Sequence, residues 1–580
     1  MEKIISITED KLDSRGLMIF PLGGQSELGQ MLWVLCYLGE ILLVDAGAAY
    51  PAQDLPGVDL LLPNTSFLEA NKDKIQALLL TNGHEEHCGA LPYILRHLSV
   101  PRVMAPRFVS AFFTQHNNSH SKIEIANNFP IETVDARQTY KLGHFQIEWV
   151  RVNDAIADAC ALHISTPEGN VLYTSSFKFD QTPVDKRVPD VRRLAQLGDD
   201  GILLLISSSA GVESYGYTPS EKSVEAVLES HINNASGRVI LVMSGTNTHR
   251  LQILFDIAKR THRRALLIGD ILIKTAVAAL VTGNLQYDPK VEVHPCDLNT
   301  LSDKELLVIA TGTEGDPMKI LSELARGTNE ELSTKEGDTV IVSAAILPGR
   351  LRQMANILDQ FLSQGVSVVQ GEQAKVHVPK HASREELKLM LSVTNPTFFI
   401  PAFGEGRHIM HHAQLAIDWG MAPDAVFPLK NGEMLSIDHG IATVIGAVES
   451  QAVLVNRDQG ERVTTFTVNE RKALSIEGII TISVVIDEQG KLLSGPRIDA
   501  GAAGFLNSRE WEETKEQMKE NILVALDAFL QKQNRSSNLD ISQLRSSLRE
   551  AALKTVRSRL QTKPIIQVFI HHLATKLPQS

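Results

Sequence analysis

Short apolar runs alternate with helix-like patterns as far as Ser450, and this alternation constrains the fold of the chain more than any other feature. The runs include residues 41–44, 77–80, 171–173, 202–206 and 239–242. Alternation of this kind is typical of layered α/β domains. Several runs are followed directly by polar side chains, at the point where loops present groups from a rigid sheet. The sequence therefore predicts an α/β protein whose functional residues lie at strand ends.

Residues 462–580 carry an α/β pattern of their own. Two strand-like runs, 478–485 and 491–498, precede two amphipathic helix patterns that a polar loop at 533–538 separates, and a last strand covers 565–570. The apolar helix positions are Met518, Ile522, Leu526 and Phe529, then Leu544, Leu548, Ala552, Val556 and Leu560. This spacing places each set on one helix face. We expect a separate small C-terminal α/β domain.

The tetrapeptide Thr218-Pro219-Ser220-Glu221 predicts a helix start within the first part of the chain. Thr218 would cap the helix, Pro219 suits its first position and Glu221 would complete a capping box. This start opens a second α/β segment, and the sequence returns to the first domain at residues 377–403.

Composition narrows the classes of function. Of the 580 residues, 43% are hydrophobic and 21% charged, as in ordinary globular proteins, and the net charge of −12 gives no overall basic field for nucleic acid. An acidic protein can still bind RNA through a local groove. Two basic stretches could contact RNA, but we expect a solvated helix end at residues 259–264 and a solvated helix face at residues 545–559.

Cysteine usage and hydropathy point to the cytoplasm. Cys36, Cys88, Cys160 and Cys296 form no CxxC pair, which argues against a disulfide scaffold or a thiolate zinc site. The leader, residues 1–15, has mixed charge and lacks the apolar core of a signal peptide. No apolar run has the length of a membrane span.

The run Thr81-Asn82-Gly83-His84-Glu85-Glu86-His87 follows the apolar run 77–80 directly. Two histidines and a carboxylate at this spacing, at the end of a strand, form the outline of a metal-ligand block. The alternative is that His84 and His87 are loop histidines that are hydrogen-bonded without metal. Asp45, which follows another strand, is expected to orient this loop.

Many further blocks occur in the order found in one family. They are Pro21-Leu22-Gly23-Gly24, Val44-Asp45-Ala46-Gly47, Phe177-Lys178-Phe179-Asp180, Ala310-Thr311-Gly312-Thr313-Glu314-Gly315-Asp316-Pro317, His377-Val378-Pro379-Lys380-His381-Ala382-Ser383 and Phe399-Ile400-Pro401-Ala402-Phe403-Gly404-Glu405. With them, the chain resembles the RNase J family of β-CASP metallo-β-lactamase ribonucleases over nearly its full length.

The resemblance implies a metallo-β-lactamase αββα sandwich with an inserted β-CASP α/β domain and a small C-terminal α/β domain. The expected limits are residues 1–208 and 373–450 for the sandwich, 209–372 for the inserted domain, 451–461 for a linker and 462–580 for the last domain. The implied activity is phosphodiester hydrolysis of RNA by 5′→3′ exonuclease and endonuclease action, with two metal ions, usually zinc, that activate a bridging water. The implied partners are RNA and a second subunit, in a homodimer or a heterodimer with an active RNase J chain.

The family's metal-ligand positions are only partly kept. Seven ligand positions fall on Asn82, His84, Glu86, His87, Asp154, Ser176 and Phe403. Of these only the two histidines match the family, while a serine replaces the bridging carboxylate and a phenylalanine replaces a histidine. Serine and phenylalanine are poor ligands for a divalent ion. We therefore expect no stable two-zinc site; a single residual site on His84, Glu86, His87 and Asp154 would suit manganese or magnesium as well as zinc.

Other functional positions are implied by the β-CASP blocks. The resemblance makes His381 and Asp316 catalytic and places His377, Lys380 and His381 at the substrate phosphate. His381 packing at a domain junction is the alternative. Pro379 removes a backbone donor from the phosphate-binding segment, while Lys380 adds a cation.

Two functions follow from these positions. The first is an RNase J-like protein of RNA maturation and decay that binds RNA or an active RNase J subunit, with catalysis lost or strongly reduced. The second is an active metal-dependent ribonuclease with a remodelled, single-metal site. Phe403 discriminates between them, because a ring packed into the metal cavity favours the first.

Overall fold

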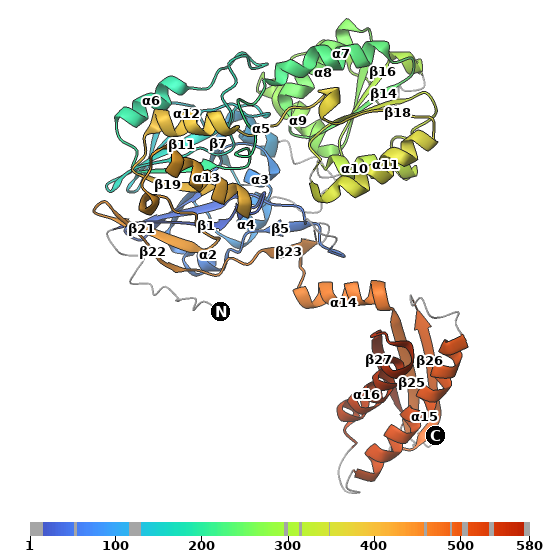
Figure 1. Ribbon diagram of the computed structural model, residues 1–580. Coiled ribbons are helices and arrows are strands. Elements are labelled where there is room, and N and C mark those ends of the chain that lie inside the picture. The colour runs from blue at the N-terminus through green and yellow to red at the C-terminus, as the bar shows by residue number, and fades with distance from the viewer. Residues whose placement is uncertain are drawn as a thin grey trace, which may run out of the picture. The chain divides into compact units, whose positions relative to one another are not determined.

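The computed structural model describes residues 16–51, 55–114, 129–294, 300–312, 316–346, 348–456, 461–487, 490–501, 509–532 and 539–573 (Figure 1). The leader at residues 1–15 and the polar loop at 533–538, both discussed above, lie outside these residues. The chain divides into two compact units. One comprises Met1–Ala52 and Leu60–Gly460, and the other Gln53–Asp59 and Glu461–Ser580.

Two facing sheets form the centre of the first unit. The first has the strand order β22-β21-β1-β3-β4-β6-β7-β8 and the second the order β19-β13-β12-β11-β10-β9. The strands of the first sheet are β1 (Leu17–Gly23), β3 (Leu32–Tyr37), β4 (Glu40–Val44), β6 (Ile75–Leu79), β7 (Val103–Pro106), β8 (Ile131–Val134), β21 (Glu433–Asp438) and β22 (Ile441–Ala447). Those of the second are β9 (Thr139–Leu142), β10 (Phe145–Arg151), β11 (Cys160–Thr166), β12 (Gly169–Tyr173), β13 (Leu204–Ser208) and β19 (Phe398–Ala402).

A shared apolar layer joins the two sheets. Trp33 and Leu42 of the first sheet and Trp149, Leu162 and Ile206 of the second belong to one fully buried cluster. Strands that are buried on both faces read as continuous apolar runs, which explains the runs seen in the sequence. Helices cover the outer faces, among them α4 (Leu91–His97), α5 (Arg107–Thr114), α6 (Val191–Asp199), α12 (Arg384–Thr394) and α13 (Gly406–Trp419) (Figure 1). The predicted αββα sandwich is confirmed.

The chain between β13 and β19 builds a second α/β layer within the same unit. Its parallel sheet has the order β15-β16-β14-β17-β18, with strands β14 (Val239–Met243), β15 (Arg264–Ile268), β16 (Leu306–Ala310), β17 (Thr339–Ser343) and β18 (Ser367–Val369). The helices α7 (Glu225–Asn234), α8 (Thr248–Arg260), α9 (Asp270–Val281), α10 (Pro317–Arg326) and α11 (Leu351–Ser363) surround it (Figure 1). β19 then pairs in parallel with β13, so the chain has returned to the sandwich by Phe398. The domain limits expected from the sequence stay a prediction.

The helix start predicted at Thr218 is wrong in its details. Ser220 is the cap, its hydroxyl accepting from the Lys222 amide, and Glu221 begins a 3₁₀ turn, η3 (Glu221–Val224), that leads into α7. Thr218 instead donates through its hydroxyl to the His381 carbonyl at 2.7 Å. Glu221 completes no capping box because its carboxylate pairs with the buried Arg250.

The second unit contains a three-stranded sheet packed against two long helices. β25 (Ile479–Asp487) lies between β26 (Leu492–Gly501) and β27 (Ile565–Leu573), antiparallel to the first and parallel to the second. The predicted helices are α15 (Arg509–Lys532) and α16 (Ile541–Leu560), and their apolar faces share one buried cluster with the alternate residues of β25. The predicted strands and helices of this unit are confirmed. A further helix, α14 (Thr465–Glu477), was not predicted.

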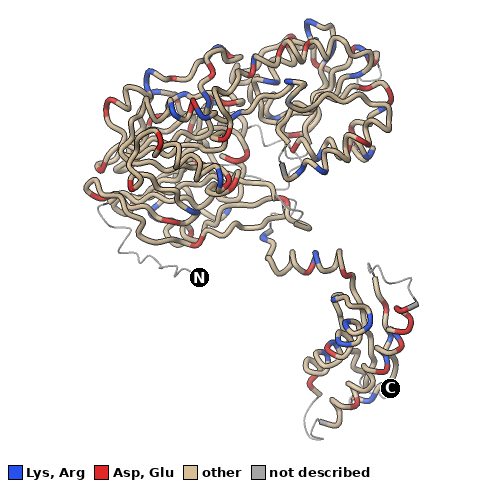
Figure 2. The backbone as a smooth tube through the Cα atoms, viewed as in Figure 1, with Lys and Arg blue, Asp and Glu red and all other residues tan. Residues whose placement is uncertain are grey.

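Figure 2 shows lysine and arginine interspersed with acidic residues along both units, in keeping with the charge balance of the sequence. Among the residues that the structure describes, no helix combines the length and apolarity needed to cross a membrane. Cys36, Cys88 and Cys160 are buried.

Candidate functional site

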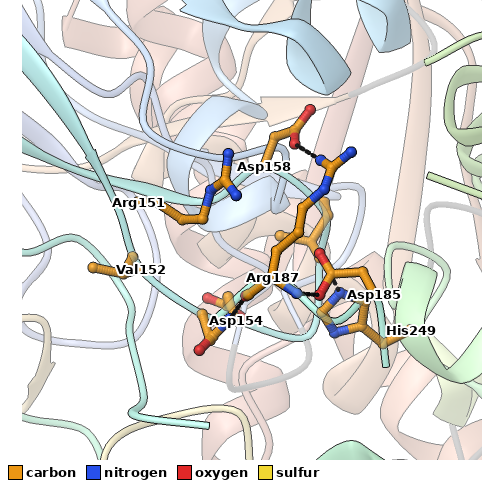
Figure 3. Close-up of a pocket in the computed structure, with 9 residues that line it drawn as sticks. Arg151, Val152, Asp154, Asp158, Asp185, Arg187 and His249 are labelled. Atoms are coloured by element: carbon orange, nitrogen blue, oxygen red, sulfur yellow. Dashed lines mark hydrogen bonds and ion pairs between the residues drawn. The ribbon is translucent and has the colours of Figure 1, made fainter. Parts of the chain in front are cut away.

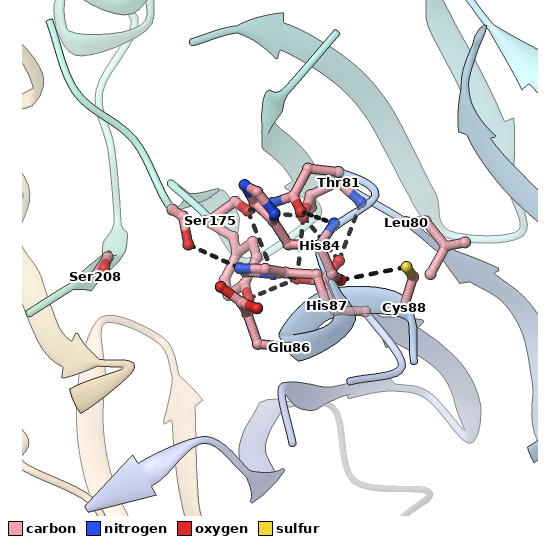
Figure 4. A network of polar contacts seen from close by, with 12 residues as sticks. Leu80, Thr81, His84, Glu86, His87, Cys88, Ser175 and Ser208 are labelled. Atoms are coloured by element: carbon pink, nitrogen blue, oxygen red, sulfur yellow. Dashed lines mark hydrogen bonds and ion pairs between the residues drawn. The ribbon is translucent and has the colours of Figure 1, made fainter. Parts of the chain in front are cut away.

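The histidine block forms the turn after β6. His84 is the N-cap of the short helix α3 (Glu85–Cys88). Asp45, which follows β4, holds the turn through hydrogen bonds. The Asp45 carboxylate accepts from the Thr81 amide at 3.0 Å and from the Thr81 hydroxyl at 2.8 Å, and the Tyr173 hydroxyl donates to it at 2.9 Å (Figure 4). Nδ1 of His87 lies 2.7 Å from the same carboxylate. Asp45 therefore orients the loop as predicted.

Both ring nitrogens of His87 hold protein partners. Because the Asp45 carboxylate accepts, Nδ1 carries a hydrogen, and Nε2 shares a hydrogen bond with the Ser176 hydroxyl, 2.8 Å away. The hydroxyl of Ser176 thus fills the direction in which a metal would bind. His87 is fully buried.

Both ring nitrogens of His84 also have protein partners, one from the sandwich and one from the inserted α/β layer. Nε2 lies 3.0 Å from Asp154 Oδ1, and Nδ1 lies 2.7 Å from the hydroxyl of Thr246, in the loop before α8. Nε2 therefore donates to the Asp154 carboxylate, while Nδ1 shares a hydrogen bond with the Thr246 hydroxyl. Thr246 was not singled out from the sequence, because an isolated threonine 162 positions away carries no local signal.

Glu86 pairs with a lysine. Nζ of Lys380 contacts Glu86 Oε1 directly, and both side chains are largely enclosed. Burial raises the pKa of the Glu86 carboxyl, but Lys380, His84 and His87 outweigh burial and hold that pKa far below its usual value. The pKa of Asp154 also falls, to about 2, because His84, Lys380 and His381 overcome the effect of burial. Both carboxyls are therefore ionised at neutral pH.

Phe403 lies between the histidines. Its ring centroid is 5.7 Å from that of His87 and 5.3 Å from that of His381, and only 2% of the residue is exposed. Its backbone has a φ of +48°, a left-handed conformation that is rare for a bulky residue. A buried aromatic ring thus stands at the position where the resemblance predicts a replaced ligand.

The β-CASP residues are placed unevenly around this cluster. Burial and the nearby Lys380 lower the pKa of His381 to about 3, and burial and Arg250 lower that of His377 to about 4, so both imidazoles are neutral at pH 7. In the described part of the chain, Nδ1 of His381 is buried without a hydrogen-bond partner. Asp316 accepts from the Met318 amide at the start of α10 and pairs with Arg350 at 2.7 Å. The structure thus gathers His84, Glu86, His87, Asp154, Lys380 and His381, whereas the described contacts of Asp316 serve a helix cap.

The residues present do not fit a two-metal centre. Four histidine nitrogens are taken by protein partners, and the Asn82 amide is also engaged, with Oδ1 accepting from the His84 amide and Nδ2 donating to Ser175 (Figure 4). Among the described residues, the group that brings three histidine, cysteine or carboxylate donors within 4.8 Å of one another is Glu168, Asp438 and His439, which is not part of this cluster. That group contains two exposed residues and no unpartnered buried side chain.

A small cavity opens beside Asp154 (Figure 3). It has a volume of about 10 Å³, and the buried Asp154 Oδ2 and Asn153 Oδ1, which have no partner among the described residues, belong to its lining. Arg187 pairs with Asp158 at its rim, at 3.1 Å. A volume of this size with several polar atoms suits a single water molecule.

In the basic stretch at residues 259–264, two arginines have partners within the protein. Arg260 of residues 259–264 pairs with Glu225 and Glu229 on α7. Arg263, expected to be solvated, is instead buried and donates to the carbonyls of Gly237, Leu306 and Ala235. The expectation was wrong for Arg263 because three backbone carbonyls, at the end of α7, in the loop before β14 and at the start of β16, accept from its guanidinium.

The buried His412, on α13, should make the free energy of unfolding depend on pH in the acid range. Its Nδ1 lies 2.9 Å from the Ser209 hydroxyl, and burial lowers its pKa from 6.5 to about 3. The unfolded chain binds a proton here below about pH 6.5 whereas the folded protein does not, so the free energy of unfolding falls as the pH falls from 6.5 toward 3. His412→Gln should flatten this decline by up to one proton, measured by urea unfolding at several pH values. The exposed His262→Gln should leave the slope unchanged, and an unchanged slope in both variants would contradict the prediction.

Comparisons with known proteins agree with this architecture. The ribonuclease J β-CASP domain matches residues 236–361, the ribonuclease J C-terminal domain residues 466–573 and the metallo-β-lactamase superfamily residues 30–179. Ribonuclease J of Synechocystis sp. is 30% identical over 96% of this chain and 87% of its own length. Ribonuclease J2 of Bacillus subtilis is 28% identical over 96% of this chain and 98% of its own length.

A solved structure supports the fold alone. A protein of unknown function from Enterococcus faecalis V583 aligns with a TM-score of 0.51 at 14% identity, over 73% of this chain and 100% of that one. The metallo-β-lactamase fold implies a metal cofactor, which the side chains at the cluster described above do not accommodate as a pair of ions. On the sequence matches and the domain order, the chain belongs to the ribonuclease J family.

Proposed function

We propose that this chain serves RNA processing in the cytoplasm as an RNA-binding member of its family in which phosphodiester hydrolysis is lost or strongly reduced. One observation carries the proposal: both histidines of the metal block have all ring nitrogens engaged by protein groups, while a lysine neutralises the carboxylate between them. Two-metal hydrolysis needs ligands free to hold the ions and a bridging water between them. The relatives are ribonucleases by name, which supports RNA as the partner. A homodimer, or a heterodimer with an active ribonuclease J chain, is the assembly we propose.

An exposed aromatic loop supports RNA binding beside the cluster. Tyr215 is 84% exposed and Tyr217 61% exposed, and the Arg384 guanidinium lies 5.8 Å from the Tyr215 ring centroid. The loop is held firmly to the His381 segment, because the Arg384 amide donates to the Ser214 carbonyl at 2.9 Å and Thr218 donates to the His381 carbonyl. Rigid exposed rings with an adjacent cation are suited to stacking single-stranded bases.

The central test combines metal analysis with cleavage of 5′-monophosphorylated RNA. We expect the purified protein to hold no stoichiometric metal, to bind the RNA and to leave it intact in Mn²⁺ or Zn²⁺. An active ribonuclease J chain serves as the positive control. Bound metal together with cleavage that His84→Ala abolishes would contradict the proposal and establish an active single-metal ribonuclease.

The binding arm of this test uses Tyr215→Ser with Tyr217→Ser. Stacking contributes about 1–3 kcal/mol per base, so the double variant should bind single-stranded RNA roughly 10-fold or more weakly. Ile441→Ser, an exposed apolar residue on β22, is the matched control and should bind normally. Equal binding by both variants in fluorescence anisotropy would remove the tyrosine loop from the RNA site.

A further inference from the structure

Two carboxylates share the enclosed cluster. Asp154 is 1% exposed, and the Glu86 side chain is 20% exposed. Carboxylates removed from water need a positive charge nearby, or they become protonated.

Lys380 supplies the positive charge. Its ammonium contacts Glu86 directly, and attraction to Glu86 and Asp154 raises its pKa despite the opposing effect of burial. Its chain segment is fixed on both sides, because Val378 and Ala382 are buried and the His381 carbonyl accepts from Thr218. The fold therefore holds the Lys380 ammonium in contact with Glu86 and close to Asp154.

We propose that Lys380 is a tethered cation that takes over the charge of a metal ion at Glu86 and Asp154 and closes this position to divalent metals. The inference rests on the proposed function and deepens it, because it names the residue that makes the cluster metal-independent. An ammonium has three donors and no acceptor, so it can neutralise carboxylates yet cannot itself bind a metal. A divalent ion approaching Glu86 meets a like charge already in contact with the carboxylate.

The test removes the tethered charge. Lys380→Met leaves Glu86 and Asp154 uncompensated, so its melting temperature should fall in EDTA and rise again with Mn²⁺, and Mn²⁺ should bind roughly tenfold or more tightly than to the wild type. The double variant Lys380→Met with Glu86→Gln removes both charges and should lose the response to Mn²⁺. Lys388→Met, which removes an exposed lysine paired with Glu385, is the matched control. The variants and the protein called wild type in this comparison all carry His439→Ala, so that the exposed group with Glu168 and Asp438 adds no background binding.

The outcomes separate this inference from the proposed function. Mn²⁺ binding and thermal rescue by Mn²⁺ that appear in Lys380→Met and disappear in the double variant support the tethered cation. A folded Lys380→Met protein without a response to Mn²⁺ overturns the tethered cation alone, with RNA binding and absent cleavage in the wild type unaffected. Stoichiometric metal in the wild type, lost in Glu86→Gln, overturns both. Should Lys380→Met fail to fold, Lys380→Gln keeps a hydrogen-bond donor for Glu86 while removing the charge, and the same outcomes apply to it.

Discussion

Replacing Arg250 with methionine is expected to lower the free energy of unfolding by about 3–5 kcal/mol, the usual cost of leaving one member of a buried ion pair uncompensated. Arg250 has no exposed surface, and its guanidinium lies 2.5 Å from Glu221. Another guanidinium nitrogen donates to the Val376 carbonyl at 3.1 Å and to the Ser343 hydroxyl. The substitution removes these donors together and leaves the buried Glu221 carboxylate without its positively charged partner.

The effect should extend to the candidate site. Val376 immediately precedes the His377–His381 segment, so loss of the Arg250 contact releases the chain that carries Lys380 and His381. Urea unfolding followed by tryptophan fluorescence measures the change through the midpoint and the slope. Arg260→Met is the matched control, because its partly exposed pair with Glu225 and Glu229 should contribute no more than about 1 kcal/mol. Equal losses in the two variants would show that burial of the Arg250 pair does not matter.

Replacing Asp45 with alanine should destabilise the first unit by about 4–5 kcal/mol, because buried donors that lose their acceptor cost about 1–3 kcal/mol each. The donors are the Thr81 amide and hydroxyl, the His87 ring and the Tyr173 hydroxyl. Asp45 also has a φ of +62°, in the left-handed region that alanine tolerates poorly.

Asp45→Asn is the matched variant for this prediction. Asparagine keeps the shape, tolerates the left-handed conformation and retains one oxygen acceptor, so its loss should be clearly smaller than that of alanine. The two variants are compared by thermal unfolding and by the rate of amide exchange in residues 81–88. Alanine and asparagine variants of equal stability would refute the view that Asp45 holds this turn through its acceptors.

Local sequence patterns were sufficient to predict most helices and strands of the C-terminal unit. The alternating residues of β25 and the i, i+4 apolar faces of α15 and α16 gave the C-terminal unit correctly, because each element buries one face that its own sequence reveals. Helix α14 was missed because only Val468 among its side chains is buried, so it has little apolar pattern. The capping box at Thr218 was wrong because Glu221 has a buried partner, Arg250, that local rules ignore.

By itself, the sequence determined the layered α/β fold and the family, and the resemblance predicted that the usual ligands are replaced at positions 82, 154, 176 and 403. Only the tertiary structure decided what replaces them: Thr246 and Asp154 satisfy His84, Ser176 satisfies His87, Phe403 packs between two histidines and Lys380 neutralises Glu86. The physical reason is that these contacts join residues as far apart in the sequence as His87 and Phe403. Hydrophobic periodicity records which face of an element is buried, whereas the partner of a buried polar group is set by how separate elements pack.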